Sequence, residues 1–438
     1  MSHPRICLIG DIVVDVTLKS ATTPVKLRLG GIVHAARALW ALNIPYSVGY
    51  FAPSYLDSNI HRYLKDFGCL EILKLGNVTG APAVFLIEEV KEIGDQGYDF
   101  LLRDEMSIEY DQGMLMNLKA NGYEDCLVIS GNYDLRMIIE YLPNQVHLDL
   151  ANNIENLDAL KGWQKKITSL FLSTSSTLFR KSFAGDFKEF AELFRLVAVQ
   201  LVLKENRGGS RAFNFDTSEI IPVAAQTRSI VHSVGVGDAY DAVFVSGYRH
   251  YGLQDALVLS SWIAGEYAST TYPDDFKTGV ERILASPIGE LKGMQGVYLP
   301  WELRPSIHIY IAAPDFSFVD TGPIDVLEKS LRYHNFMPRR PIKENGEMEP
   351  RAGKARRQEL FIKDMLILHE SRLLVGVLLY DDPGTYLEIG YAAAKGIPTI
   401  VFDPYGRGTN CMLTELPTLL SNDLDEIMAE IFIQAAKL

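Results

Sequence analysis

The sequence predicts an α/β protein of two domains, each built on a mostly parallel sheet that helices cover. Its 438 residues exceed what one hydrophobic core usually supports. Short apolar runs alternate with helical patterns along the chain, as expected for parallel strands joined by helices. A stretch without periodicity at 294–306 is interrupted by a glycine and two prolines. We therefore expect domains at 1–298 and 306–438.

The first domain is expected to contain apolar strands separated mostly by helices. The strand-like runs are 5–10, 46–51, 83–88, 126–130, 145–150, 169–172 and 201–204. The helical patterns are 33–40, 186–198, 253–272 and 276–285.

A second α/β pattern follows the boundary. Its expected strands are 307–313, 372–380 and 399–402, and its helices 324–333, 362–369 and 385–395. The polar segment 338–357 is rich in arginine and lysine. Two interpretations stay open for this segment, a solvated mobile loop or a lid that attracts phosphate.

Composition narrows the class of protein. A net charge of −13 argues against broad nucleic-acid binding. The longest apolar run, 373–380, is far shorter than a membrane span. Four scattered cysteines without a paired motif suit reduced thiols, so we expect a cytoplasmic protein without membrane contact. The nine histidines show no ligand spacing, and we expect no fixed metal.

The run Ser233-Val-Gly-Val-Gly-Asp-Ala-Tyr-Asp-Ala-Val-Phe244 predicts an anion site. Gly235, Val236 and Gly237 precede an apolar helical pattern, where free N–H groups and the helix dipole favour a phosphate. Asp238 would stand beside that phosphate as a general base. The alternative is a glycine-rich turn in which Asp238 only caps the helix.

The first domain resembles the ribokinase-like (PfkB) family of sugar and nucleoside kinases. The matching features are Gly10-Asp11…Asp15, the Gly30-Gly31 pair, the Lys204…Gly208-Gly209 turn and Ser233…Gly237-Asp238. The resemblance implies a three-layer ribokinase-like fold. Asp15 and Gly31 would hold sugar hydroxyls, and Gly235 to Gly237 would receive the phosphoryl group. Asp238 would deprotonate the attacking hydroxyl. The turn from Lys204 to Gly209 and the segment near 265–272 would border ATP.

Two departures put this kinase activity in question. His34 stands where the family usually has asparagine, although it remains a candidate for substrate binding. The family's Asn-x-x-Glu motif, which organises magnesium, is expected near 171–180, and this chain has no carboxylate there. The domain is thus either a kinase that uses ATP and Mg²⁺ or a remnant that binds ligand without catalysis.

A pair of carboxylates near the C-terminus forms the second candidate site. Asp382 follows a buried strand and Glu388 lies one or two turns into the next helix, so both can face the crevice where open α/β sheets bind ligands. Such a carboxylate can attack an anomeric carbon while a second carboxyl moves protons. An acidic helix N-terminus, which the dipole favours, is the structural alternative.

Residues 307–438 resemble the nucleoside 2-deoxyribosyltransferase family, a smaller doubly wound, flavodoxin/Rossmann-like sheet. The resemblance rests on Ile309-Tyr310…Pro314, on Asp364, on Asp382-x-Gly384-Thr385-x-x-Glu388 and on Asn410-x-Met412. It implies Glu388 as nucleophile on C1′, with Asp364 and Asp382 engaging the base. Tyr310 would position Glu388, while Asn410 and Gly384 would contact substrate. No cofactor is implied, and the family forms homo-oligomers with shared sites.

We thus expect a nucleoside- or nucleotide-processing enzyme acting on small molecules, possessing an N-glycosidic site and a kinase-like domain. Base exchange and nucleotide N-hydrolysis remain open, the latter because 339–357 is basic. One alternative is an N-glycosidase whose first domain only binds ligand or builds an oligomer. Another is a nucleotide sensor with little turnover.

Overall fold

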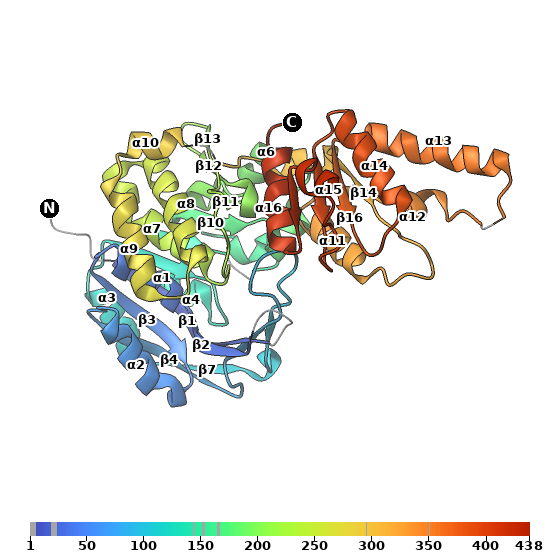
Figure 1. Cartoon of the computed structure of the whole chain (residues 1–438). Helices are drawn as coiled ribbons and strands as arrows, with labels where there is room; N and C mark the ends of the chain where they lie inside the picture. The colour runs from blue at the N-terminus through green and yellow to red at the C-terminus, as the bar shows by residue number, and fades with distance from the viewer. Residues whose placement is uncertain are drawn as a thin grey trace. The chain divides into compact units, whose positions relative to one another are not determined.

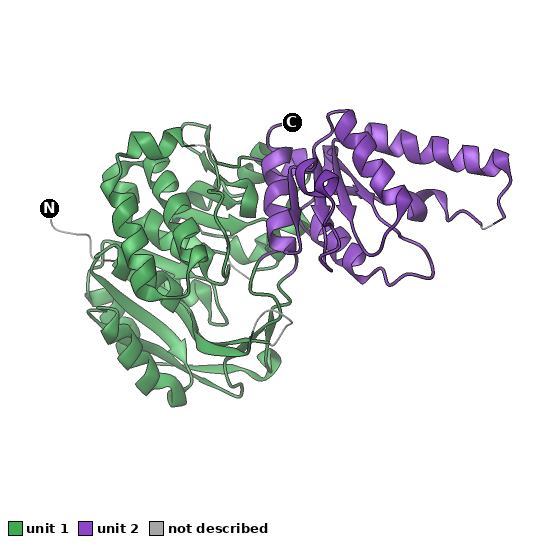
Figure 2. Ribbon diagram, viewed as in Figure 1, with its two compact units in different colours: residues 1–91, 96–298 green, residues 92–95, 299–438 purple. Residues whose placement is uncertain are grey.

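The structure is a computed structural model that describes residues 6–18, 24–142, 145–150, 154–163, 167–294, 296–349 and 351–438. It divides into two compact units, drawn in green and purple in Figure 2. Unit 1 comprises Met1–Lys91 and Gln96–Tyr298, and unit 2 comprises Glu92–Asp95 and Leu299–Leu438.

Unit 1 is organised around a large, mostly parallel sheet. Its strands are β1 (Ile6–Thr17), β2 (Lys26–Gly31), β3 (Tyr46–Ala52), β4 (Ile72–Thr79), β5 (Val84–Ile87), β6 (Asp99–Phe100), β7 (Ser107–Tyr110), β8 (Asp125–Ile129), β9 (Val146–Asp149), β10 (Ile167–Ser173), β11 (Ala198–Lys204), β12 (Ser210–Asn214) and β13 (Glu219–Val223). The main order is β13-β12-β11-β10-β9-β8-β1-β3-β4-β7. Pairing is parallel from β11 to β4, and the outer strands β7, β12 and β13 are antiparallel. This arrangement confirms the predicted fold class.

Strand β1 pairs with strands of two sheets, one along each half of its length. Its first half, Ile6 to Asp11, pairs with β3, and within it Ile6 to Ile9 also pair with β8. Its second half pairs with β2 and β5, which extend a smaller sheet away from the main one. The strand order reverses at the β1–β8 pair, the kind of position where open α/β sheets bind ligands.

The helices of unit 1 cover this sheet (Figure 1). They are α1 (Val33–Ala41), α2 (Asp57–Asp66), α3 (Gln112–Ala120), α4 (Leu135–Glu140), α5 (Thr177–Ser182), α6 (Phe187–Glu192), α7 (Val236–Tyr251), α8 (Leu253–Ser269), α9 (Pro273–Ala285) and α10 (Ile288–Gly293). Helix α1 packs against α7, and small side chains such as Ala35, Ala38 and Ala239 let the two approach closely in the core.

Unit 2 contains a five-stranded sheet, entirely parallel, in the order β15-β14-β16-β17-β18. Its strands are β14 (His308–Ala312), β15 (Met337–Arg339), β16 (Leu373–Val377), β17 (Thr399–Phe402) and β18 (Leu419–Ser421). Its helices are α11 (Gly322–Tyr333), α12 (Pro341–Asn345), α13 (Lys354–Glu370), α14 (Pro383–Ala394), α15 (Cys411–Glu415) and α16 (Leu424–Ala435). This is the flavodoxin-like order, which reverses between β14 and β16.

Two expected elements are wrong. The helix expected at 186–198 ends at Glu192, because the chain turns and Ala198 already opens strand β11. The segment expected as a loop or lid at 338–357 holds the end of β15, helix α12 and the start of α13. Residue 5 of the expected strand 5–10 and residue 350 of the segment 338–357 lie outside the described residues.

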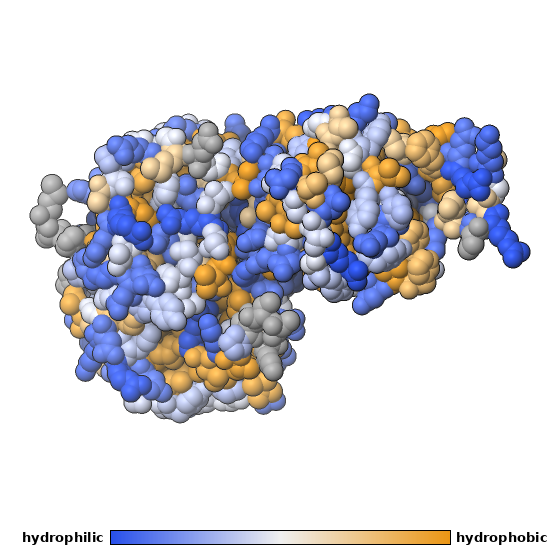
Figure 3. All heavy atoms as spheres, viewed as in Figure 1, coloured by the Kyte–Doolittle hydropathy of each residue, from blue (hydrophilic) through white to orange (hydrophobic). Residues whose placement is uncertain are grey.

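The surface mixes polar and apolar residues on the face shown in Figure 3. Helix α13 exposes three large apolar side chains, Phe361, Ile362 and Leu366, at 63%, 58% and 57% of their area. None of the helices in the described ranges has the length and hydropathy needed to span a bilayer.

Candidate active site

The first site lies in unit 2, where strand β14 faces helix α14. The hydroxyl of Tyr310 donates a hydrogen bond to Oε1 of Glu388 at 2.7 Å. Tyr310 is fully buried in the centre of β14, so its hydroxyl is held by the sheet. The structure thus brings together the two residues that the sequence suggested as nucleophile and positioning group.

Glu388 has an unusual acidity. The pKa of Glu388 is raised to about 7, chiefly because the carboxyl group is buried. The hydrogen bond from Tyr310 lowers the pKa, and the carboxylates of Asp364 and Asp382 raise it. The negative charges of both aspartates therefore act on the Glu388 carboxyl group. A carboxyl group that titrates near pH 7 suits chemistry that needs both a proton acceptor and a nucleophile.

Asp382 is the N-cap of helix α14. Its Oδ2 accepts hydrogen bonds from the backbone N–H and the hydroxyl of Thr385, both at 2.8 Å. Gly384 lies in the same turn, where an added Cβ would be 3.2 Å from Oδ2 of Asp382. Asp382 therefore caps helix α14, as the structural alternative predicts, and both hydrogen bonds of this cap use the Oδ2 atom.

Asp364 projects from helix α13 and is partly buried. The amide of Asn345, at the end of α12, donates to Oδ1 of Asp364 at 2.8 Å. Burial raises the pKa of Asp364, while this hydrogen bond lowers it. Sequence reasoning missed Asn345, and no local pattern distinguishes it because its partner lies on the next helix.

Asn410 is placed differently from the other residues of the unit 2 site. It is exposed and caps α15, where its Oδ1 accepts from the backbone N–H of Met412 at 2.9 Å. The hydrogen bonds described for its side chain include none to Glu388.

Two arginines of the basic segment, Arg339 and Arg340, are neutralised by carboxylates of unit 2. Arg340 is buried and pairs with Asp315, Asp325 and Glu328 at 2.6–2.7 Å. Arg339 pairs with Glu344 at 2.7 Å. The idea of a phosphate-attracting lid is therefore wrong for these two arginines, because their guanidinium groups stabilise unit 2 internally. Lys343, Arg351, Lys354 and Arg357 remain exposed.

The second site lies in unit 1, at the N-terminus of α7. Gly235 adopts φ +77°, and a Cβ there would lie 2.2 Å from Cγ of His34. Val236 and Gly237 form the first turn of α7. The expected helix start is thus present, and only glycine fits against the His34 ring.

Lys204 reaches the same turn from the end of β11. Its ammonium donates to Oδ2 of Asp149 at 2.9 Å and to Oδ2 of Asp241 at 2.8 Å. A Cβ on Gly237 would lie 3.3 Å from Nζ. Burial lowers the pKa of Lys204, but the two carboxylates outweigh burial and raise it, so it stays charged. Sequence reasoning did not identify either aspartate.

Asp238 lies next to this group. Burial, followed by the Asp149 carboxylate, raises its pKa to about 8, while Lys204 lowers it. The charge of Asp15 also raises the pKa of Asp238, so both Lys204 and Asp15 influence the protonation of Asp238. Gly31 (φ +69°) ends β2 close to the Asp11 carbonyl, and Gly209 (φ +97°) closes the turn after β11.

Among the described residues of unit 1, the side chains near the first turn of α7 do not form a ligand set for a magnesium ion. Segment 171–180 contains no carboxylate, and Asp149 and Asp241 are both occupied by Lys204. The described residues contain no group of three or more His, Cys, Asp or Glu side chains that could hold a metal ion. The ammonium group of Lys204 lies between the carboxylates of Asp149 and Asp241, where a magnesium ion would need oxygen ligands.

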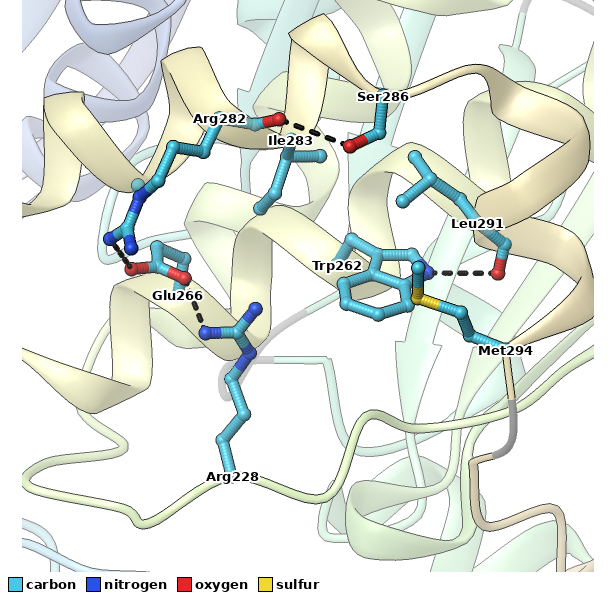
Figure 4. Close-up of a pocket in the computed structure, with 9 residues that line it drawn as sticks. Arg228, Trp262, Glu266, Arg282, Ile283, Ser286, Leu291 and Met294 are labelled. Carbon is cyan, nitrogen blue, oxygen red and sulfur yellow. Dashed lines mark hydrogen bonds and ion pairs between the residues drawn. The ribbon is translucent and has the colours of Figure 1, made fainter.

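A separate pocket of about 160 Å³ lies among α8, α9 and α10. Figure 4 shows Glu266 between Arg228, at 2.6 Å, and Arg282, at 3.6 Å. The indole N–H of Trp262 donates to the carbonyl of Leu291. These polar groups satisfy one another. Glu266 belongs to the segment 265–272 that the kinase resemblance places beside the nucleotide, whereas the other candidate site residues do not line this pocket.

Unit 2 is an α/β unit with an entirely parallel sheet, and its candidate site contains the Tyr310–Glu388 hydrogen bond. Within this unit, residues 309–421 match the family model described as nucleoside 2-deoxyribosyltransferase. This match confirms the resemblance of the second part of the chain. A search of curated proteins found no match.

Similar solved structures over the N-terminal part are kinases of the ribokinase family. A ribokinase of Arabidopsis thaliana, complexed with ribose and ATP, is 14% identical, with 65% of this chain and 100% of that chain covered and a TM-score of 0.47. Phosphofructokinase-2 from Escherichia coli, in complex with potassium, is 13% identical, with 64% and 99% covered and a TM-score of 0.48. A nucleoside kinase of Methanocaldococcus jannaschii is 14% identical, with 64% and 98% covered and a TM-score of 0.41.

Proposed function

We propose that unit 2 cleaves the N-glycosidic bond of nucleosides or nucleotides, with Glu388 as nucleophile. The observation that carries this proposal is the 2.7 Å hydrogen bond from Tyr310 to Glu388. The proximity of Asp364 and Asp382, and the match of residues 309–421 to the deoxyribosyltransferase family, support it.

The reaction proceeds through a covalent intermediate. The free oxygen of the Glu388 carboxylate attacks C1′ as the bond to the base nitrogen breaks, and the bonding electrons leave with the base. Asp364 or Asp382 delivers a proton to the departing base. Water or a second base then attacks C1′, and the bond from C1′ to Glu388 breaks. The aspartate that protonated the first base takes the proton of this nucleophile, and both carboxyl groups return to their starting state. Tyr310 keeps Glu388 oriented through both steps.

The acidity of Glu388 sets a pH dependence. Attack requires the ionised carboxylate, and its pKa is raised to about 7 by burial. The rate of base release at low substrate should therefore rise through pH 7, as long as the proton donor remains protonated.

Screening nucleosides and 5′-monophosphates for free base by chromatography tests the proposal. Running each reaction with and without an acceptor base separates exchange from hydrolysis. Glu388→Gln should abolish base release, while Glu349→Gln, an exposed glutamate in the same unit, should leave it unchanged. Base release that survives in Glu388→Gln would contradict the mechanism.

For unit 1 we propose ligand binding without phosphoryl transfer. Its support is Lys204, which occupies both carboxylates that converge beside the first turn of α7. ATP consumption with sugars or nucleosides in the presence of Mg²⁺ would contradict this proposal. If neither unit turns over substrate and nucleotides raise the melting temperature, the sensor hypothesis is favoured instead.

A further inference from the structure

A group of basic side chains lies buried in unit 1 outside the Glu388 site. We call Arg28, His34, Arg37 and His232 the basic cluster. They come from β2, from α1 and from the segment before α7, and they surround Asp15 and Tyr267. The side chains of His34, Arg37 and His232 are all more than nine-tenths buried.

Asp15 joins the first two members. It pairs directly with Arg28 across the β1–β2 ladder. Its Oδ2 lies 3.6 Å from Nε of Arg28 and 3.2 Å from Nε2 of His34. Arg28 and His34 therefore meet on one carboxylate oxygen.

Tyr267, on α8, joins the other members. Its hydroxyl lies 2.6 Å from Nδ1 of His34. The guanidinium of Arg37 lies 5.2 Å from the centre of the Tyr267 ring, and the His232 ring lies 5.3 Å from it. All four basic side chains thus contact one buried Asp–Tyr pair.

Several nitrogen atoms of the basic cluster have no hydrogen-bond partner among the described residues, although Nε of Arg28 forms an ion pair with Asp15. Within the described residues, no hydrogen-bond partner is present for Nε and Nη2 of Arg28, for Nε and Nη2 of Arg37, or for Nδ1 of His232. Buried polar groups are nearly always satisfied, because an unpaired donor loses its hydration without compensation. Such a concentration of orphaned nitrogens in one place therefore requires an explanation.

The charge of the basic cluster is also unbalanced. It holds two arginines and one partner carboxylate, Asp15. Burial and, to a smaller extent, the charge of Arg28 lower the pKa of His232 to about 4, so this ring is neutral at pH 7. The remaining net charge is positive, which is costly in a buried site unless an anion compensates it.

We propose that the basic cluster binds the anionic group, phosphate or carboxylate, of a small molecule. Arginine suits both groups, since its planar fork of donors matches two oxygens at once. The side chain of Arg28 remains 27% exposed, so it is the member that meets a ligand entering from solvent. The site includes Asp15 and His34, so it rests on the ligand binding proposed for unit 1 and specifies the chemical group that unit 1 would recognise. It is separate from the proposed glycosidase chemistry.

Isothermal titration calorimetry on the full chain tests this proposal. Ribose 5-phosphate supplies a phosphate, gluconate supplies a carboxylate and ribose is the neutral reference. We expect at least one of the two anions to bind at least tenfold more tightly than ribose. The comparison between them identifies which anionic group is preferred.

Substitutions of Arg28 test whether the anion binds at the basic cluster. Arg28→Met should weaken anion binding at least tenfold, and Arg28→Lys should lose less. Lys26→Met removes the same charge from an exposed position on the same strand and should leave affinity unchanged. Because Arg28 lies in unit 1, its effect also separates this site from product binding near Glu388.

Three results would overturn the proposal. These are an absence of binding by both anions, ribose binding as tightly as the anions, or equal effects of Arg28→Met and Lys26→Met. The wild-type titrations decide the first two results even if Arg28→Met fails to fold. Arg28→Gln, which keeps a polar side chain, then replaces it in the third comparison.

Discussion

Replacing Glu388 by glutamine should inactivate unit 2 and, above neutral pH, stabilise it. Glutamine keeps an oxygen that accepts the Tyr310 hydrogen bond, so the local packing is preserved. It removes the cost of ionising a carboxyl group that burial and two neighbouring aspartates disfavour. Function and stability are therefore opposed at this residue.

The size of the gain follows from the acidity of Glu388. Each pKa unit corresponds to about 1.4 kcal/mol. The rise from 4.5 to about 7 therefore corresponds to at most about 3 kcal/mol. Partial contact of the side chain with solvent lowers the expected gain to about 1–3 kcal/mol.

The pH dependence has a defined sign. The folded pKa of Glu388 is above the unfolded one, so the wild-type protein loses stability, relative to the variant, as pH rises from 4.5 to about 7. Glu388→Gln should thus match wild type near pH 4.5 and exceed it at pH 8. Urea unfolding at several pH values, followed by hydrogen exchange in peptides from unit 2, measures this difference.

A matched control isolates the effect of burial. Glu349→Gln removes an exposed carboxylate from the same unit and should show no pH-dependent difference. A constant difference between Glu388→Gln and wild type from pH 5 to 8 would refute the reasoning, as would a variant that is less stable at pH 8.

Further predictions concern the neighbouring features. Lys204→Met should lower the free energy of unfolding by about 3 kcal/mol or more, since it leaves Asp149 and Asp241 without their counter-charge; denaturant titration measures this, and an unchanged midpoint would disprove the role of the ion pairs. Asp364→Asn should reduce base release about 100-fold or more if Asp364 donates the proton. Asn345→Ala should have a smaller effect, because Asn345 only orients Asp364. Equal losses of activity in kinetic assays of the two variants would contradict these roles. We also expect a homo-oligomer through the exposed apolar face of α13, so Leu366→Glu should lower the mass found by light scattering, and a wild-type monomer would exclude it.

The sequence was most informative where function depends on local order. Asp382 caps helix α14 after strand β16, and Glu388 lies within that helix, so their places in the fold could be predicted from the strand–helix pattern alone. Tyr310 was found through the family resemblance. The hydrogen bond between Tyr310 and Glu388 connects residues 78 positions apart, a separation that no local pattern encodes.

Long-range charge pairing was the main feature that sequence patterns could not reveal. The basic residues at 339–357 looked available for a ligand, yet Arg340 is enclosed by Asp315, Asp325 and Glu328 from outside that segment. Lys204 was expected near a nucleotide, and its pairing with Asp149 and Asp241 depends on three separate elements. Charge alone does not show which arginine or lysine has a partner in the fold.

The continuity of β1 restricts how the basic cluster can open. The same strand holds the main sheet through its first half and the smaller sheet, which carries Arg28, through its second. A hinge between these sheets must bend β1 near Asp11, whose carboxylate accepts hydrogen bonds from the backbone and side-chain amides of Asn132. Any movement of the smaller sheet relative to the main sheet therefore twists one unbroken strand, and the smaller sheet is not a freely jointed flap.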